Sequence, residues 1–542
     1  MSRRPLVFTF GTHCLSNSQM ILSNYLVPSL FLDEYTFLKL FFIRYKKQNM
    51  EAQTKLIDVP AFIKDSGAEK VLASLKQSVG GKEFIISDVF DAEGNQYVDL
   101  VQEGGGVWGV ALLGYTYILE KMGIRFFSLA GTSAGAINTM LMAATKPKNE
   151  EKTELIIDHL LRLDMFSFVD GKKNNWIITK TIKKLIQRLI VKPGYTKRVA
   201  AVFIILISLL TGLSLASFLT IILAKAKPVD FLAITALVLW LVVIFILALL
   251  ISRIKFIAKS GYGLNEGKVF YNWINQILAY NNIYNLEDLK TKFCTVPPDL
   301  KVRRDEMRDA IVAGEILPPS SPMLIIVASD ITTGNKIEFP RMWDMFWKST
   351  SDVDPASFVR ASMSIPIFFE TYKIPVNIPF NSAVEIWKNH INWNGDIPDH
   401  VEMVDGGVLS NFPINVFYNA KYIIPRMPTF GIRLGGSGIQ AAKKINSIPA
   451  YFSSLISTLR GTTDKDFINK NKAFELGVKE VDLSKYSWLN FFMSVEDKKA
   501  IFLKGAEAAA IFLEQFNWTN YKQERFNNSV VLEEQRKNPN NW

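Results

Sequence analysis

The sequence contains few cysteines and no pattern of metal ligands. Its 542 residues include two cysteines, Cys14 and Cys294, which lie far apart and have no ligand-forming neighbours. A disulfide framework and a zinc site are therefore not indicated. We expect two ordinary thiols, no metal and no other cofactor.

The N-terminus lacks the continuous apolar core of a signal peptide. Polar residues interrupt the first apolar stretch between Thr9 and Ser18. A signal peptide needs an unbroken apolar core, so we expect none here. Residues 1–49 are interpreted as an irregular segment without assigned function, and residues 50–96 as an N-terminal extension.

Charged residues are missing from two long stretches in the middle of the chain, 199–224 and 231–252. Each stretch exceeds the ~20 apolar residues that a helix needs to cross a bilayer. Two buried core helices are the alternative, but such helices seldom run so long without a polar face. The link 225–230 is short and contains Pro228. The sequence therefore predicts an antiparallel transmembrane hairpin over residues 199–252.

Basic residues gather at the open ends of this hairpin and contribute to a net charge of +11. They are Lys183, Lys184, Arg188, Lys192, Lys197, Arg198, Arg253, Lys255 and Lys259. The positive-inside rule places both open ends, and the domain they flank, on the cytoplasmic face. Such cations also attract anionic lipid headgroups. Because no nucleic-acid-binding motif is present, we expect an integral membrane protein with a lipid bilayer as partner and no nucleic acid. The oligomeric state stays open.

A glycine-rich turn follows the first predicted strand, 97–102. The turn contains Gly104, Gly105 and Gly106 and leads into a helical pattern over 110–122. Such a turn exposes backbone N–H groups at the positive end of a helix. It can cradle a phosphate or form an oxyanion hole for acyl transfer, whereas its spacing does not fit a dinucleotide-binding loop.

A second strand, 124–129, leads into a G-x-S-x-G motif. Gly131 and Gly135 flank Ser133, and a helical pattern follows over 137–144. In this strand-turn-helix context the motif is typical of a nucleophile elbow, whose small residues permit a strained turn. A helix-capping serine is the alternative. The glycine-rich turn upstream favours Ser133 as a nucleophile.

The candidate base is Asp405, which follows a short strand over 402–404 and precedes Gly406 and Gly407. The two glycines let the backbone turn sharply, so the carboxylate can face another loop. A carboxylate in hydrogen-bond reach can accept the serine proton. The alternative is that Asp-Gly-Gly forms an ordinary turn without a catalytic role.

A triad is the other alternative for the base. The chain has four histidines, at positions 13, 159, 390 and 400. Ser133, Asp330 and His400 follow the chain order of α/β-hydrolases. The surroundings of His400 do not look like a catalytic loop, so the sequence favours Asp405.

Together these motifs resemble those of the patatin-like phospholipases, which combine a glycine-rich oxyanion turn, a G-x-S-x-G elbow and a D-G-G or D-G-A aspartate. The resemblance covers roughly residues 97–435, with the hairpin as an insertion. Two further segments look similar, Gly-Tyr-Gly-Leu at 261–264 and the stretch 360–369. One position departs, because family members often carry Arg or Lys where this chain has Trp108.

The resemblance implies a Ser-Asp dyad of Ser133 and Asp405, with the amides of Gly104 to Gly106 as the oxyanion hole. It also implies a three-layer α/β domain with a mostly parallel central sheet. Further apolar runs at 322–329 and 429–434 fit such a sheet, and 495–516 reads as a long closing helix. The expected parts are 97–198 and 253–440 for the two halves of this domain, 441–516 for a C-terminal helical region, and 517–542 for a loose polar tail.

The expected function is that of a membrane-anchored lipid acyl hydrolase of the phospholipase A or lysophospholipase type, acting through an acyl-enzyme. A tethered site meets lipid at high local concentration, so membrane phospholipids or lysophospholipids are the expected substrates. A transacylase with the same dyad, a catalytically decayed membrane scaffold and a soluble esterase with two buried helices are the alternatives.

Overall fold

The structure is a computed structural model. It describes residues 58–81, 83–163, 168, 261–305, 321–419, 423–435, 464, 466–488, 490 and 493–537, with scattered helical positions between 201 and 252. The chain divides into two units, 1–56 and 57–542, and every described residue belongs to the second. The segment expected over residues 1–49 lies outside the described residues.

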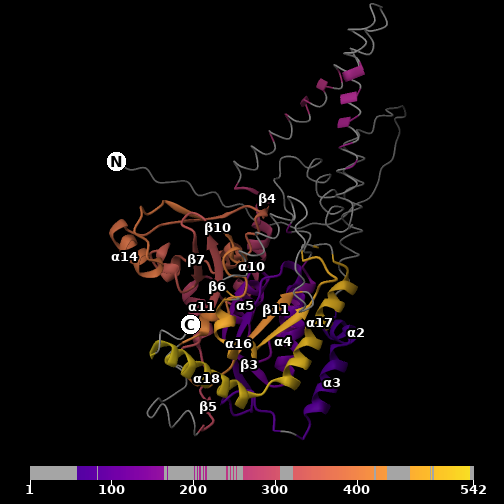
Figure 1. Cartoon of the computed structure of the whole chain (residues 1–542), viewed down its shortest axis with the longest axis vertical. Helices are drawn as coiled ribbons and strands as arrows, with labels where there is room; N and C mark the ends of the chain where they lie inside the picture. Colours follow the sequence, from indigo (N-terminus) through magenta and orange to yellow (C-terminus); the bar gives the residue numbers. More distant parts are fainter. Residues whose placement is uncertain are drawn as a thin grey trace, which may run out of the picture. The chain divides into compact units, whose positions relative to one another are not determined.

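Helices and strands are interspersed along the described chain (Figure 1). The helices are α2 Val59–Ser66, α3 Ala68–Val79, α4 Gly109–Lys121, α5 Ala134–Ala144, α6 Thr153–Leu161, α10 Lys268–Tyr280, α11 Leu286–Cys294, α13 Ala356–Ser362, α14 Phe380–Ile391, α16 Lys472–Glu475, α17 Val495–Gln515 and α18 Trp518–Lys537. The strands are β1 Val89–Phe90, β2 Gln96–Gln102, β3 Ile124–Thr132, β4 Gly263–Asn265, β5 Lys301–Val302, β6 Leu324–Asp330, β7 Asn335–Phe339, β8 Ile367–Phe369, β9 Tyr372–Pro375, β10 His400–Asp405, β11 Thr429–Gly435 and β12 Val478–Asp482.

The main sheet has the strand order β12-β11-β2-β3-β6-β10-β9. Strands β12 to β6 run parallel, whereas β7 and β10 pair antiparallel with β6, and β9 pairs antiparallel with β10. The sheet is therefore mixed, and the expectation of a mostly parallel sheet is wrong for one side of it. The turn between β6 and β7 spans only residues 331–334, and so short a connection permits only antiparallel pairing.

The sheet packs on both faces because consecutive residues of a strand point to opposite sides. Along β2, β3 and β6, neighbouring residues enter different apolar clusters: Leu100 and Val101, Leu129 and Ala130, Ile326 and Ile325. The larger cluster includes residues of α4, α5, α13 and α17, and the smaller one includes Phe412, Ile414 and Phe474. Strands β2, β3 and β6 are thus held between two packed layers.

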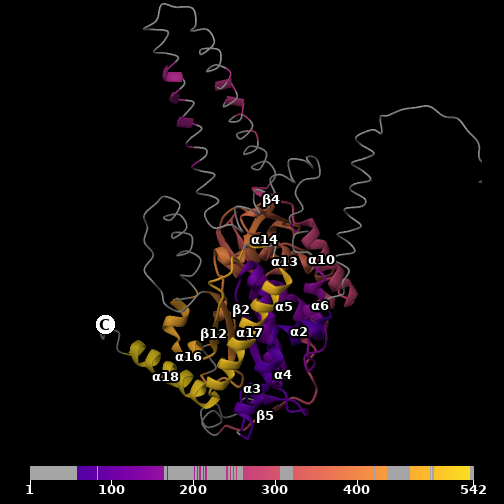
Figure 2. The same ribbon diagram turned by 90° about the vertical axis from the view of Figure 1, so that its right-hand side faces the viewer.

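The C-terminal region closes the larger face through α17, which packs along α4 (Figures 1 and 2). A Cβ at Gly114 would collide with the Phe502 carbonyl, and one at Gly505 would collide with the Ala111 carbonyl. Glycine at both positions therefore lets the two helix backbones touch.

Two parts of the C-terminal region differ from expectation. The stretch 441–516, expected to be helical, contributes the sheet strand β12. The expected loose tail is instead helical from residue 518 to 537, because Trp518 and Tyr521 are buried and anchor α18 to the body.

The predicted hairpin, 199–224 and 231–252, lies mostly outside the described residues. Among the residues that are described, no helix is long and apolar enough to cross a bilayer. The single described positions in the two stretches are helical, and several carry exposed apolar side chains, among them Ile204, Leu215, Leu241 and Phe245.

Candidate active site

Ser133 and Asp405 meet because two strands end against each other on one edge of β6. Strand β3 pairs with β6 up to Thr132 opposite Val327, and β10 pairs with the next residue, with Asp405 opposite Ala328. Strand β7 pairs with both Val327 and Ala328 as well. Because a strand has two edges, β3 and β10 share the edge opposite β7 and approach from opposite directions. The residue that follows β3 and the last residue of β10 are therefore neighbours.

The turn at Ser133 is strained and fixed from two sides. Its φ of 54° and ψ of −118° lie outside the regions that ordinary residues favour. The Ser133 amide donates to Ser362 Oγ at 2.9 Å, and that hydroxyl donates to the Val327 carbonyl at 2.6 Å. A Cβ at Gly131 would collide with the Gly135 carbonyl, and a Cβ at Gly135 with the backbone of β2. The elbow therefore needs both glycines.

The Ser133 hydroxyl donates a hydrogen bond to Asp405 Oδ2 at 2.6 Å. It also lies 3.3 Å from the sulfur of Met363. The other carboxylate oxygen, Oδ1, accepts from the Gly407 amide at 2.8 Å. Ser133 and Asp405 are 3% and 2% exposed. In such a low-dielectric site the hydrogen bond is strong, and the carboxylate stands where it can accept the serine proton.

The glycine-rich turn lies directly against the nucleophile elbow. A Cβ at Gly104 would lie 3.0 Å from the Ser133 Cβ. The Gly104 amide donates to the Asn411 carbonyl at 3.0 Å, so it is already engaged. Within the part of the chain that the structure describes, the amides of Gly105 and Gly106 donate to no acceptor. Gly106 has a φ of +56°, and a Cβ there would collide with the Trp488 carbonyl.

Trp108 occupies the position where patatin-like phospholipases often carry Arg or Lys. Its ring nitrogen donates to the Tyr486 carbonyl at 3.1 Å. The Val107 amide donates to the Trp488 carbonyl at 3.0 Å. The turn is thus braced by the segment between β12 and α17, and not by a charge at this position.

Three polar residues that the sequence did not single out hold the loops of the site together: Glu103, Asn411 and Asp464. Asn411 donates through Nδ2 to the Gly104 carbonyl at 3.0 Å and to Glu103 Oε1 at 3.1 Å. Glu103 Oε2 accepts from the Leu434 amide at 2.6 Å, and burial raises the pKa of Glu103 to about 7. Asn411 belongs to the loop that follows Asp405, so it links the candidate base to the glycine-rich turn.

Asp464 fixes the same loop from outside the motifs. Its Oδ1 accepts from the Ser410 hydroxyl at 2.7 Å, and its Oδ2 accepts from the Phe412 amide at 2.9 Å. Asp464 is buried, and burial raises its pKa. Its only signal in the sequence is an aspartate in a polar stretch, so it could be found only from the contacts.

The structure does not bring the triad alternative together. His400 lies at the opposite end of β10 from Asp405, on the order of 17 Å away at ~3.3 Å per residue. Its ring lies 3.9 Å from Glu402. Asp330 accepts hydrogen bonds from the Thr332 amide and the Thr333 hydroxyl at the end of β6. None of these contacts of His400 and Asp330 involves Ser133. The triad alternative is therefore wrong.

The two further segments noted in the sequence lie together beside the elbow. Strand β4, which contains Gly263 and Leu264, pairs in parallel with β8. Buried Arg360 donates to the Ser364 hydroxyl at 2.6 Å and to the carbonyls of Glu266 and Glu370 at 2.9 Å each. One guanidinium therefore joins α13, which ends at Ser362, to both strands of the small sheet.

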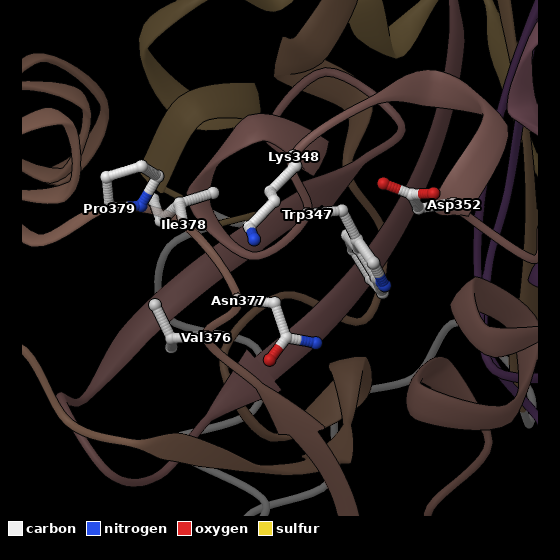
Figure 3. Close-up of a pocket in the computed structure, with 7 residues that line it drawn as sticks. All are labelled: Trp347, Lys348, Asp352, Val376, Asn377, Ile378 and Pro379. Atoms are coloured by element: carbon white, nitrogen blue, oxygen red, sulfur yellow. The ribbon is translucent and has the colours of Figure 1, made fainter.

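An open groove of about 590 Å³ lies away from this site (Figure 3). Its lining residues are Trp347, Lys348, Asp352, Val376, Asn377, Ile378 and Pro379. Figure 3 shows Lys348, Trp347 and Asn377 around its centre. The groove borders the end of β9, whose Pro375 pairs with His400 and not with the Asp405 end of β10. It is therefore separate from the Ser133–Asp405 pair.

Comparisons with known proteins find similar chains. The sequence is 24% identical over 426 residues to an uncharacterized protein, YqhO, of Bacillus subtilis (strain 168), covering 78% of this chain and 99% of that protein. The crystal structure of VipD from Legionella pneumophila is 12% identical, covering 81% of this chain and 73% of that chain. Its TM-score of 0.32 is too low to support an argument.

A family profile provides the stronger result. The profile of the patatin-like phospholipases matches residues 100–418. This range contains the glycine-rich turn from Gly104, the elbow at Ser133 and the aspartate at 405, and it covers more than half of the chain. The chain belongs to the patatin-like phospholipase family.

Proposed function

We propose that this lipid acyl hydrolase cleaves carboxylic esters of membrane phospholipids or lysophospholipids with Ser133 as nucleophile and Asp405 as base. The observation that carries the proposal is the 2.6 Å hydrogen bond from the Ser133 hydroxyl to Asp405 Oδ2 at the strained elbow. Ser133 Oγ bonds to the acyl carbon while its proton passes to Asp405. The leaving alcohol takes that proton, and an acyl-enzyme remains.

Water completes the cycle. It attacks the acyl-enzyme and gives one proton to Asp405, and the C–Oγ bond then breaks as Ser133 regains that proton. The amides of Gly105 and Gly106 are the proposed oxyanion donors, because the Gly104 amide already donates to Asn411. The turn holding them lies against Ser133, as the close approach of Gly104 indicates.

The proposed membrane anchor is the hairpin of residues 199–224 and 231–252, with the catalytic domain on the cytoplasmic face. Its support is the uncharged length of both stretches and the basic residues at their open ends. The exposed apolar side chains at the described helical positions add to this support, as does a hydrogen bond from the Trp240 ring to the Ser214 hydroxyl between the two stretches. Carbonate extraction of membranes tests it, because an anchored chain stays in the pellet.

The test of the reaction uses the full chain in detergent with a mixed phospholipid panel. We expect release of free fatty acid and covalent labelling of Ser133 by a fluorophosphonate. No release and no labelling would support a decayed scaffold instead. Addition of a lysolipid acceptor separates hydrolase from transacylase, because a transacylase would form a new diacyl lipid at the expense of free fatty acid.

Asp464→Asn is expected to lower kcat about tenfold with little change in KM. The variant retains one oxygen acceptor, so either Ser410 or Phe412 loses its bond and the loop beside the oxyanion turn loosens. The matched control is Asp466→Asn, which removes only an exposed ion pair with Lys470. Steady-state kinetics on a short-chain ester measure both parameters, and equal kcat values for the two variants would contradict the positioning role.

A further inference from the structure

Two large apolar side chains stand on the surface beside the active site, each in an unfavourable backbone conformation. Tyr262 and Ile367 are 60% and 72% exposed. Their φ angles are +62° and +71°. A β-branched residue at positive φ is a genuine outlier, and such strain costs on the order of 1–3 kcal/mol. Glycine or asparagine would relieve both the strain and the apolar exposure, so folding alone does not explain these residues.

The two residues, named here the apolar pair, are held close together by the small sheet. Gly263, the neighbour of Tyr262, lies opposite Ile367 in the parallel pairing of β4 with β8. The Thr371 amide donates to the Gly261 carbonyl at 2.8 Å, which ties the turn that carries Tyr262 to the β8 side. The backbone segments that carry Tyr262 and Ile367 are therefore fixed next to each other.

The apolar pair is connected to the nucleophile through one short segment. Ile367 comes four residues after Met363, whose sulfur contacts the Ser133 hydroxyl. The side chain of Arg360 binds the carbonyls on either side of the small sheet. This guanidinium is buried and makes three hydrogen bonds, so it couples the small sheet to Ser362 and Met363, which contact Ser133.

We infer that the apolar pair inserts into the lipid surface on which the enzyme acts, an inference that rests on the proposed function. Transfer of an exposed apolar side chain from water into an apolar phase lowers the free energy. Tyrosine is favoured where hydrocarbon meets headgroups. Only residues 253–260 separate the uncharged stretch 231–252 from Gly261, and they include three basic residues suited to anionic headgroups. This continuity favours a bilayer over a protein as the partner.

The test replaces both members by asparagine, Tyr262→Asn with Ile367→Asn, because asparagine tolerates positive φ. The full chain is reconstituted in vesicles of phosphatidylcholine and phosphatidylglycerol. We expect fatty-acid release from the vesicles to fall at least tenfold. Turnover of a dispersed short-chain ester in detergent stays within twofold of wild type, and the melting temperature stays equal or rises. The control is Tyr280→Asn, which changes a 78% exposed tyrosine at the end of α10 and leaves both activities unchanged.

A contact measurement separates this inference from the proposed function. In an Ile367→Trp variant, acyl-brominated lipids are expected to quench the tryptophan fluorescence by a larger fraction than they do in the wild type. Absence of extra quenching would overturn the lipid contact even if the enzyme hydrolyses esters, and so would equal losses in the vesicle and detergent assays. If wild type hydrolyses nothing while the extra quenching persists, the proposed function fails and the lipid contact stands.

Discussion

Ser133→Ala and Asp405→Asn are each expected to abolish fatty-acid release, with kcat falling roughly 10⁴-fold or more. The alanine variant has no nucleophile. In the asparagine variant the amide oxygen can still accept from Gly407, so the loop keeps its shape, but the proton of Ser133 Oγ has no base. The measurement is fatty-acid release from mixed micelles together with fluorophosphonate labelling.

The double variant sharpens this test. Residues that act as one unit give non-additive losses, so Ser133→Ala with Asp405→Asn is expected to be no worse than Ser133→Ala alone. His400→Ala is the control, since this side chain is half-exposed at the far end of β10. Activity retained in Asp405→Asn and lost in His400→Ala would refute the dyad.

Gly106→Ala is expected to lower kcat by about 10²- to 10³-fold, the effect of losing an oxyanion donor. The new Cβ would meet the Trp488 carbonyl, which is backbone and cannot swing aside, so the turn must shift. KM is expected to change little, because the affected donors act on charge that develops in the transition state. Single-turnover kinetics on a short-chain ester report the chemical step directly.

Gly334→Ala is the matched control for backbone strain. Gly334 also has a positive φ, +73°, but a Cβ there meets nothing within 4 Å. This variant is expected to lose on the order of 1 kcal/mol of stability and to keep its kcat. A similar loss of kcat in both glycine variants would show that general destabilisation, and not displaced oxyanion donors, explains the effect at Gly106.

Much of the site could be predicted because its parts are local. A strand, a tight turn and a helix between Ile124 and Ala144 determine the elbow. The collision that Gly131 avoids is with the carbonyl of Gly135 in the same elbow, whereas the one that Gly135 avoids is with β2. The β3 strand predicted over 124–129 runs to Thr132, and the closing helix predicted over 495–516 is α17. Hydrophobic periodicity and turn chemistry act over such short distances, so they can be recognised without knowledge of the fold.

Expectations failed where long-range pairing decides. Nothing near Gly104 in sequence indicates that the Asn411 carbonyl takes its amide, and nothing near Asp464 indicates its bonds to Ser410 and Phe412. The sequence of β12 was expected to be helical and that of α18 to be a loose polar tail. The parts of the molecule that order them are distant along the chain: β12 pairs with β11, and α18 is anchored by the buried side chain of Trp518.

The sequence by itself determined the chemical groups: a serine on a tight turn, an aspartate before two glycines, and a glycine-rich turn. Only the tertiary structure decided that Ser133 and Asp405, 272 residues apart, are neighbours. The reason is physical. Local sterics set the ends of β3 and β10, but their meeting depends on both strands pairing with the same edge of β6 from opposite directions.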